Sequence, residues 1–114
     1  MTDAVAQQTQ VAALPTVLAA LQDPVRLEMV RRLHNADRAV RCAALYDDIN
    51  KSTATHHFKI LREAGLTERL VIDGQIYQHL LTDSVDAALP GLLASIVEAA
   101  NKAAAEPEGS APGG

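Results

Sequence analysis

Apolar residues recur at helical spacing in the first part of the chain and predict two helices there. The first helix is expected over about residues 11–21, or only from Pro15, because proline is tolerated in the first turn of a helix and not in its interior. Its repeating apolar residues are Val11, Leu14, Leu18 and Leu21. The second helix is expected from Pro24 to about Leu33, since Asp23 can cap its first N–H groups. Its buried face is expected to be Leu27, Val30 and Leu33.

An amphipathic segment with a polar start occupies the middle of the chain. Residues 34–40 predict a loop and residues 42–47 a short helix. A longer helix is expected over residues 52–64, with Ser52 able to cap its start and Gly65 able to end it. Its apolar positions, spaced four and three apart, are Ala54, Phe58 and Leu61. One face of this helix can therefore pack on a domain while the other stays polar.

Towards the C-terminus the pattern becomes β-like before a last helix. Two β-prone runs, at 67–72 and 75–81, flank the pair Asp73-Gly74, which predicts a hairpin with a type I′ turn. Residues 82–89 are expected to form a connector or a short helical turn, and Pro90 to open the last helix. Two short helices, an amphipathic helix and a hairpin in this order predict a mainly α-helical fold with a β-hairpin wing, the winged helix-turn-helix.

Length and composition favour one domain. The chain has 114 residues, of which 48% are hydrophobic and 3% aromatic, so an aliphatic core is expected. The domain is placed at residues 11–103, between a flexible N-terminus at 1–10 and a disordered tail at 104–114. The single cysteine, Cys42, excludes an internal disulfide. The sequence shows neither a signal pattern nor an apolar run long enough to cross a bilayer, so a cytoplasmic protein without membrane contact is expected.

The net charge of −4 is unevenly distributed along the chain. Residues 24–71 hold nine Lys and Arg against six Asp and Glu, a net charge of +3. Residues 1–23 carry −2 and residues 72–114 carry −5. The positive segment contains the amphipathic helix, as expected of a surface that meets DNA phosphates. The acidic ends argue against binding to phosphates without regard to sequence.

Three stretches resemble the bacterial ArsR/SmtB family of small dimeric transcriptional repressors. Residues 21–33, LQDPVRLEMVRRL, are similar to the family's second helix with its Asp-Pro-x-Arg-Leu motif. Residues 52–66, STATHHFKILREAGL, are similar to its recognition helix, and residues 69–81, RLVIDGQIYQHLL, to its wing. The resemblance implies a sequence-specific DNA-binding regulator, most simply a repressor, that places the recognition helix 52–64 in the major groove of double-stranded operator DNA.

The N-terminal end of the recognition helix carries the residues expected to read bases. This end of such a helix meets base edges, and its N–H groups favour phosphate. Hydroxyl and imidazole groups can donate to or accept from bases, and the resemblance places base contacts at Ser52, Thr55 and His56. Basic residues further along suit phosphates. The full set of expected DNA contacts is Lys51, Ser52, Thr53, Thr55, His56, Lys59, Arg62, Arg69 and Gln75.

Structural alternatives stand beside two of these assignments. Ser52 can cap the helix, with or without a base contact. For His57, packing is favoured over a DNA contact, because adjacent residues lie about 100° apart around a helix and His56 and His57 cannot face one groove equally. The wing tip around Asp73 lacks Lys and Arg, so its minor-groove contacts are expected to be weak.

The resemblance also implies a symmetric homodimer formed by the first and last helices. Both helices are apolar on a broad face and rich in alanine, and a monomer of this size would expose that face to water. The residues expected at the interface are Val11, Leu14, Leu18, Leu92, Leu93, Ile96 and Val97. The alternative is that both apolar stripes belong to the core, and each helix can serve both purposes.

Many members of this family release DNA when they bind a metal, but their ligand patterns are not reproduced here. Where one family site has a Cys-x-Cys pair this chain has only Cys42, and where another has histidines and acids on the last helix it has only Glu98. No cofactor is therefore required. The alternative left open is a nickel or zinc site built from His79 with Asp83 or Asp86, although an ordinary strand residue is the favoured interpretation of His79. A redox role for Cys42 is less favoured than packing as a small hydrophobe.

Two further functions are kept beside the DNA-binding regulator. One is a metal-responsive version of it, whose operator affinity changes with nickel or zinc. The other is a winged-helix protein-interaction module that does not read DNA. An enzyme is not expected, because the sequence has no phosphate loop, nucleophile elbow or paired carboxylates.

Overall fold

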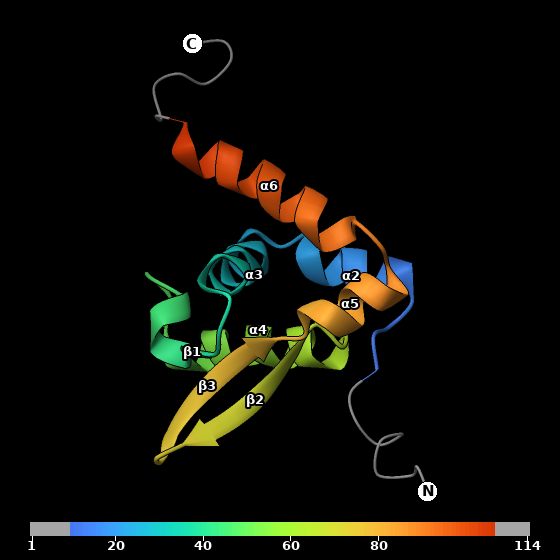
Figure 1. Ribbon diagram of the computed structural model, residues 1–114. Helices are drawn as coiled ribbons and strands as arrows, with labels where there is room; N and C mark the ends of the chain where they lie inside the picture. Colours follow the sequence, from blue (N-terminus) through green and yellow to red (C-terminus); the bar gives the residue numbers. More distant parts are fainter. Residues whose placement is uncertain (1–9, 107–114) are drawn as a thin grey trace, which may run out of the picture.

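The computed structural model describes residues 10–106 and shows helices packed around a central helix, with a small sheet at one edge (Figure 1). This arrangement confirms the predicted mainly α-helical fold with a β-hairpin wing. In chain order the elements are α2 (Leu14–Leu21), α3 (Pro24–Ala36), β1 (Val40–Arg41), the 3-10 helix η1 (Cys42–Leu45), α4 (Lys51–Glu63), β2 (Thr67–Ile72), β3 (Gln75–Leu80), α5 (Thr82–Ala88) and α6 (Leu92–Ala105). The predicted flexible N-terminus 1–10 and disordered tail 104–114 lie almost wholly outside the described residues, and residues 104 and 105 continue α6.

The sheet has three antiparallel strands in the order β1-β3-β2. The predicted hairpin is confirmed, with Asp73 at φ 51° and Gly74 at φ 78°, the positive values that a type I′ turn needs. The sequence predicted only a loop where β1 lies. Its two residues pair with β3, Val40 opposite Gln78 and Arg41 opposite Tyr77. A strand this short has no periodicity of its own and exists because β3 supplies its partners.

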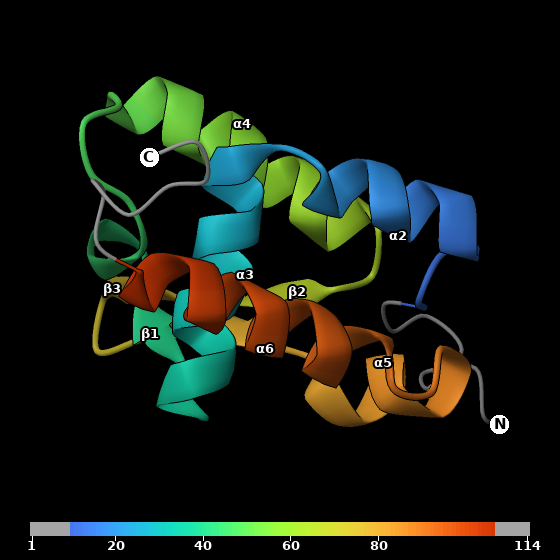
Figure 2. The same cartoon turned by 90° about the horizontal axis from the view of Figure 1, so that it is seen from above.

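Helix α3 lies at the centre of the domain. In Figure 1, α6 lies above it and α4 below it, and Figure 2 shows α6 crossing over it. Val30 and Leu33 are buried as predicted, but Met29 is also fully buried, whereas Leu27 is only half-buried. Around α3 the core is completed by Val17 and Leu21 from α2, Phe58 and Leu61 from α4, and Leu93 and Val97 from α6.

Several element ends differ from the predictions. Helix α3 continues to Ala36, so the loop expected from residue 34 begins at residue 37. Asp37 ends the helix by adopting a left-handed conformation at φ 55°. The short helix is a 3-10 helix over Cys42–Leu45 and stops before residue 47. Helix α6 begins at Leu92 and not at the proline, because Gly91 at φ 81° interrupts the helical path.

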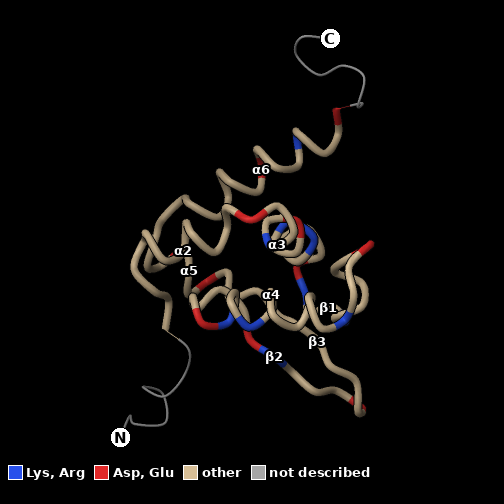
Figure 3. The backbone as a smooth tube through the Cα atoms, turned by 180° about the vertical axis from the view of Figure 1, so that it is seen from behind, with Lys and Arg blue, Asp and Glu red and all other residues tan. Residues whose placement is uncertain are grey.

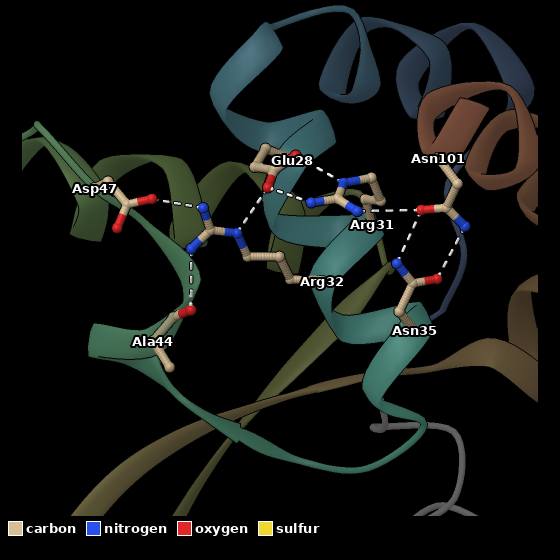
Figure 4. Close-up of polar contacts among 7 residues, drawn as sticks. All are labelled: Glu28, Arg31, Arg32, Asn35, Ala44, Asp47 and Asn101. Atoms are coloured by element: carbon tan, nitrogen blue, oxygen red, sulfur yellow. Dashed lines mark hydrogen bonds and ion pairs between the residues drawn. The ribbon is translucent and has the colours of Figure 1, made fainter. Parts of the chain in front are cut away.

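A network of charged and amide side chains joins α3 to its neighbours (Figure 4). Glu28 accepts hydrogen bonds from Arg31 at 2.8 and 2.7 Å and from Arg32 at 2.7 Å. Arg32 also donates to Asp47 at 2.6 Å, in the segment that precedes α4. On the other side, Arg31 donates to Asn101 of α6 at 3.2 Å. The network therefore ties α3 both to α6 and to the approach of α4.

Replacing Glu28 with glutamine is expected to remove part of the protein's sensitivity to acid. The hydrogen bonds from Arg31, and then those from Arg32, lower the pKa of Glu28 from 4.5 to about 2. Because the pKa is lower in the folded state, this stabilisation is complete above the unfolded value and is lost as the pH falls from about 4.5 towards 2. The carboxylate is partly exposed, and screening limits the effect to about 1–2 kcal/mol.

Urea unfolding at a series of acidic pH values tests this expectation. The native protein should lose more stability between pH 5 and pH 2 than Glu28→Gln does. Glu63→Gln is the matched control, because Glu63 and Lys59 form only an exposed pair at 3.9 Å. Equal acid sensitivity in the native protein and in Glu28→Gln would contradict the assignment.

Candidate nucleic-acid interface

The start of α4 is capped by a residue that the sequence did not single out. The Asn50 side chain accepts a hydrogen bond from the Thr53 N–H at 2.7 Å, so Asn50 and not Ser52 is the N-cap. The predicted capping role of Ser52 is wrong, because the helix begins one residue earlier, at Lys51. Ser52 belongs to the first turn of α4 and is exposed to solvent.

Helix α4 divides cleanly into a buried and an exposed face. Ala54, Phe58 and Leu61 are buried, as their spacing predicted. Among the expected DNA contacts, the exposed ones on α4 are Lys51, Ser52, Thr53, Thr55, His56 and Lys59. His56 is exposed, whereas His57 is half-buried and its Nδ1 lies 3.0 Å from Arg26 of α3. The interpretation of His57 as a packed residue agrees with this position.

A groove of about 690 Å³ runs between η1, α4 and the hairpin. Its polar and charged rim includes four basic side chains, and no Asp or Glu belongs to the lining formed by the described residues. The four are Arg41, Lys51, Arg62 and Arg69. Figure 3 shows Lys and Arg positions in blue on β1, α4 and β2. Thr55 and Gln75 also line the groove, so it brings together residues of α4 and of the hairpin that are distant in sequence.

Arg41 is the groove residue that the sequence analysis missed. It is exposed on β1, and its guanidinium donates to the Gln75 side chain of the wing at 2.7 Å. No sequence pattern indicated this position, because Arg41 lies outside both α4 and the hairpin. Only the pairing of β1 with β3 brings Arg41 to the groove. Lys59, by contrast, lies outside the groove lining and pairs with Glu63 at 3.9 Å.

The turn at the tip of the wing holds the acid Asp73, and exposed aliphatic side chains flank it. Val71, Ile72 and Ile76 are 60%, 43% and 39% exposed. Val71 and Ile76 are cross-strand partners, so they share one face of the hairpin. The wing therefore presents aliphatic side chains and one acid beside Gln75, and the expected weakness of its minor-groove contacts stays a prediction.

The residues expected at a dimer interface fall into three groups. Leu14 and Leu18 of α2 are 44% and 43% exposed and are free to meet a partner. Val11, Leu92 and Ile96 are partly buried against the core. Leu93 and Val97 are 0% and 1% exposed, so their prediction as interface residues is wrong. Both residues belong to the core, because the apolar stripe of α6 that contains them packs on α3 of the same chain.

The weak metal candidates are not brought together. His79 of β3 lies 2.8 Å from Glu68 of β2, a cross-strand pair, while Asp83 and Asp86 are exposed on α5. Within residues 10–106 no group of three or more His, Cys, Asp or Glu side chains is placed to hold a metal ion. Cys42 is half-buried and accepts a hydrogen bond from the Gln78 amide at 3.6 Å.

Comparisons with known proteins give a consistent picture. Residues 21–69 match the family described as helix-turn-helix domain. The chain is 35% identical over 82 residues to an uncharacterized HTH-type transcriptional regulator, YceK, of Bacillus subtilis, covering 70% of this chain and 82% of that protein. None of the helices within residues 10–106 has the length and apolar character needed to cross a membrane.

Two solved structures have a similar fold. The transcriptional repressor BigR from Xylella fastidiosa aligns with a TM-score of 0.59 and 24% identity, over 75% of this chain and 84% of that one. An ArsR-like transcriptional regulator from Rhodococcus sp. RHA1 aligns with a TM-score of 0.57 and 22% identity, over 81% and 87% of the two chains. At these identities the likeness concerns the fold.

Proposed function

Because the chain belongs to the family of HTH-type transcriptional regulators and has the winged fold of ArsR-like ones, we propose that it represses transcription by binding operator DNA as a homodimer. Regulation of transcription through DNA binding is the function of this family. The cytoplasm is the compartment that such a regulator needs in order to meet its operator.

One observation carries the proposed mode of binding. The exposed polar half of α4 stands beside a groove rimmed by four cations and lined by no described acid. A helix of this width fits the major groove, where hydroxyl and imidazole groups can pair with base edges. Arg41, Arg62 and Arg69 then meet the adjoining phosphates, and each neutralised phosphate releases counterions. The acidic remainder of the chain confines this attraction to one surface.

Replacing Thr55 and His56 together with alanine is expected to weaken operator binding by roughly 1–3 kcal/mol for each good base contact, about 5- to 150-fold for one such contact. Both side chains are exposed on α4, so the fold should be unaffected. The operator is first obtained by selecting bound fragments from genomic DNA, and affinity is then measured by fluorescence anisotropy at fixed salt. Ser84→Ala, at an exposed polar residue of α5 outside the groove lining, is the matched control.

Two results would count against this proposal. If no DNA fragment is enriched, or if the Thr55 and His56 substitutions leave function intact, a winged-helix protein-interaction module becomes the better account. The nickel- or zinc-responsive version stays a prediction, and operator affinity measured with and without each metal tests it. An unchanged affinity would remove it.

A further inference from the structure

Arg26 connects three helices through one side chain. Its Nε donates to the Ala20 carbonyl at 2.7 Å and its Nη2 to the Ala19 carbonyl at 3.5 Å, near the C-terminal end of α2. Its Nη1 lies 3.0 Å from Nδ1 of His57, on the recognition helix α4. Arg26 itself belongs to the first turn of α3. This one guanidinium therefore adds a polar link between α4, α2 and α3 to the packing of Phe58 and Leu61 on the core.

The chemistry of this contact determines the charge of His57. A guanidinium has only N–H donors, so the 3.0 Å contact requires Nδ1 to accept with its lone pair. His57 must then be neutral, with its proton on Nε2. A second proton on the ring would occupy Nδ1 and place two cations in direct contact. The bond from α3 to α4 would be lost.

Two other ionisable groups lie near His57, namely the carboxylate of Asp23 and the imidazole of His56. The Asp23 carboxylate lies close enough to attract both Arg26 and His57. Its Oδ1 already accepts from the Val25 and Arg26 N–H groups at 2.8 and 3.1 Å. Asp23 therefore offsets part of the repulsion but leaves the Arg26 guanidinium without its acceptor. The His56 ring centre lies 6.2 Å from that of His57, on the exposed side of the same helix.

We propose that His57 positions the recognition helix by accepting a hydrogen bond from Arg26, and that operator binding weakens when His57 takes up a proton. The inference rests on the proposed DNA-binding function and adds a pH response to it. Neither His57 nor Arg26 has to touch DNA. Histidine is the side chain that ordinarily changes charge between about pH 5 and pH 8, and the test covers that range.

The test uses the full chain with His56→Gln as the background. His56 is expected beside DNA, and its protonation near phosphates would raise affinity and mask the effect of His57. In this background, operator affinity should fall about tenfold between about pH 8 and about pH 5.5. Adding His57→Gln, whose amide oxygen can accept from Arg26 without titrating, should abolish the fall. Adding His57→Leu, which offers no acceptor, should lower affinity at every pH.

The imidazole nitrogen shifts of His57, measured by NMR, provide a second readout that needs no DNA. Nδ1 should be unprotonated at about pH 8. The inference is overturned if Nδ1 carries the proton there, or if the acid loss of affinity persists with His57→Gln. Failure to bind DNA at any pH would count against the proposed function, and the nitrogen shifts would still decide the role of His57.

Discussion

Gly65→Ala is expected to destabilise the protein by roughly 3 kcal/mol or more. A Cβ at Gly65 would overlap the Gln10 carbonyl oxygen and lie 2.6 Å from the Val11 Cα. Both are backbone atoms, so they cannot turn aside as a flexible side chain would. The backbone of Gly65 also has φ +81°, where any other residue is strained. Steric overlap and backbone strain thus act at the same position.

The surroundings of Gly65 explain why the chain cannot simply relax. The Gly65 N–H donates to the Arg62 carbonyl at 3.0 Å and the Leu66 N–H to the Leu61 carbonyl at 3.1 Å, the Schellman pattern that ends α4. The segment before α2 crosses this end and is held there, because the Ala12 N–H donates to the Ala64 carbonyl at 2.9 Å. Pushing Gln10 away would therefore break the docking of the N-terminal segment on α4.

Gly74→Ala is the matched control for this prediction. Gly74 has φ +78°, nearly the same as Gly65, but a Cβ there would meet nothing within 4 Å. It should show the backbone strain alone, about 1–2 kcal/mol. Urea unfolding of the two variants separates the steric part from the strain. A loss at Gly65 no larger than that at Gly74 would contradict the close crossing.

The double substitution Leu14→Glu with Leu18→Glu is expected to convert the protein to a monomer and to weaken operator binding by about 100-fold or more. The two leucines are one turn apart on α2 and are 44% and 43% exposed, so the acidic side chains can be accepted by the single chain. In the proposed symmetric dimer they would meet their own copies, and buried like charges would repel. Each monomer would then hold one operator half-site without help from a second.

Analytical ultracentrifugation measures the oligomeric state, and fluorescence anisotropy with the selected operator measures affinity. Val71→Glu is the matched control for the first measurement, because it introduces the same acid at an exposed aliphatic residue on the wing, away from α2. It should leave the oligomeric state unchanged. A double variant that sediments like the native protein would exclude α2 from the interface.

Local sequence was sufficient for the features that depend on near neighbours. Asp73-Gly74 predicted the hairpin because a type I′ turn is set by the residues in it. Asp23 predicted the start of α3, and its carboxylate accepts from the Val25 and Arg26 N–H groups. The apolar spacing of α4 predicted its buried face, because a helix has a regular period. These interactions span a few residues and need no partner element.

Other features were decided only when distant segments met. Leu93 and Leu14 are both leucines on amphipathic helices, and only the packing of α6 on α3 buries one and leaves the other exposed. Arg41 reaches the groove only because β1 pairs with β3.

The sequence by itself determined the order of the elements, the polar face of the recognition helix and the positive charge around it, since each follows from local period and composition. The tertiary structure decided which cations share one groove, which leucines remain exposed, and that His57 contacts Arg26. The physical reason is the separation along the chain over which each interaction acts. Backbone hydrogen bonding and helical period act within a turn or two, whereas burial and side-chain partners depend on residues that are close only after folding.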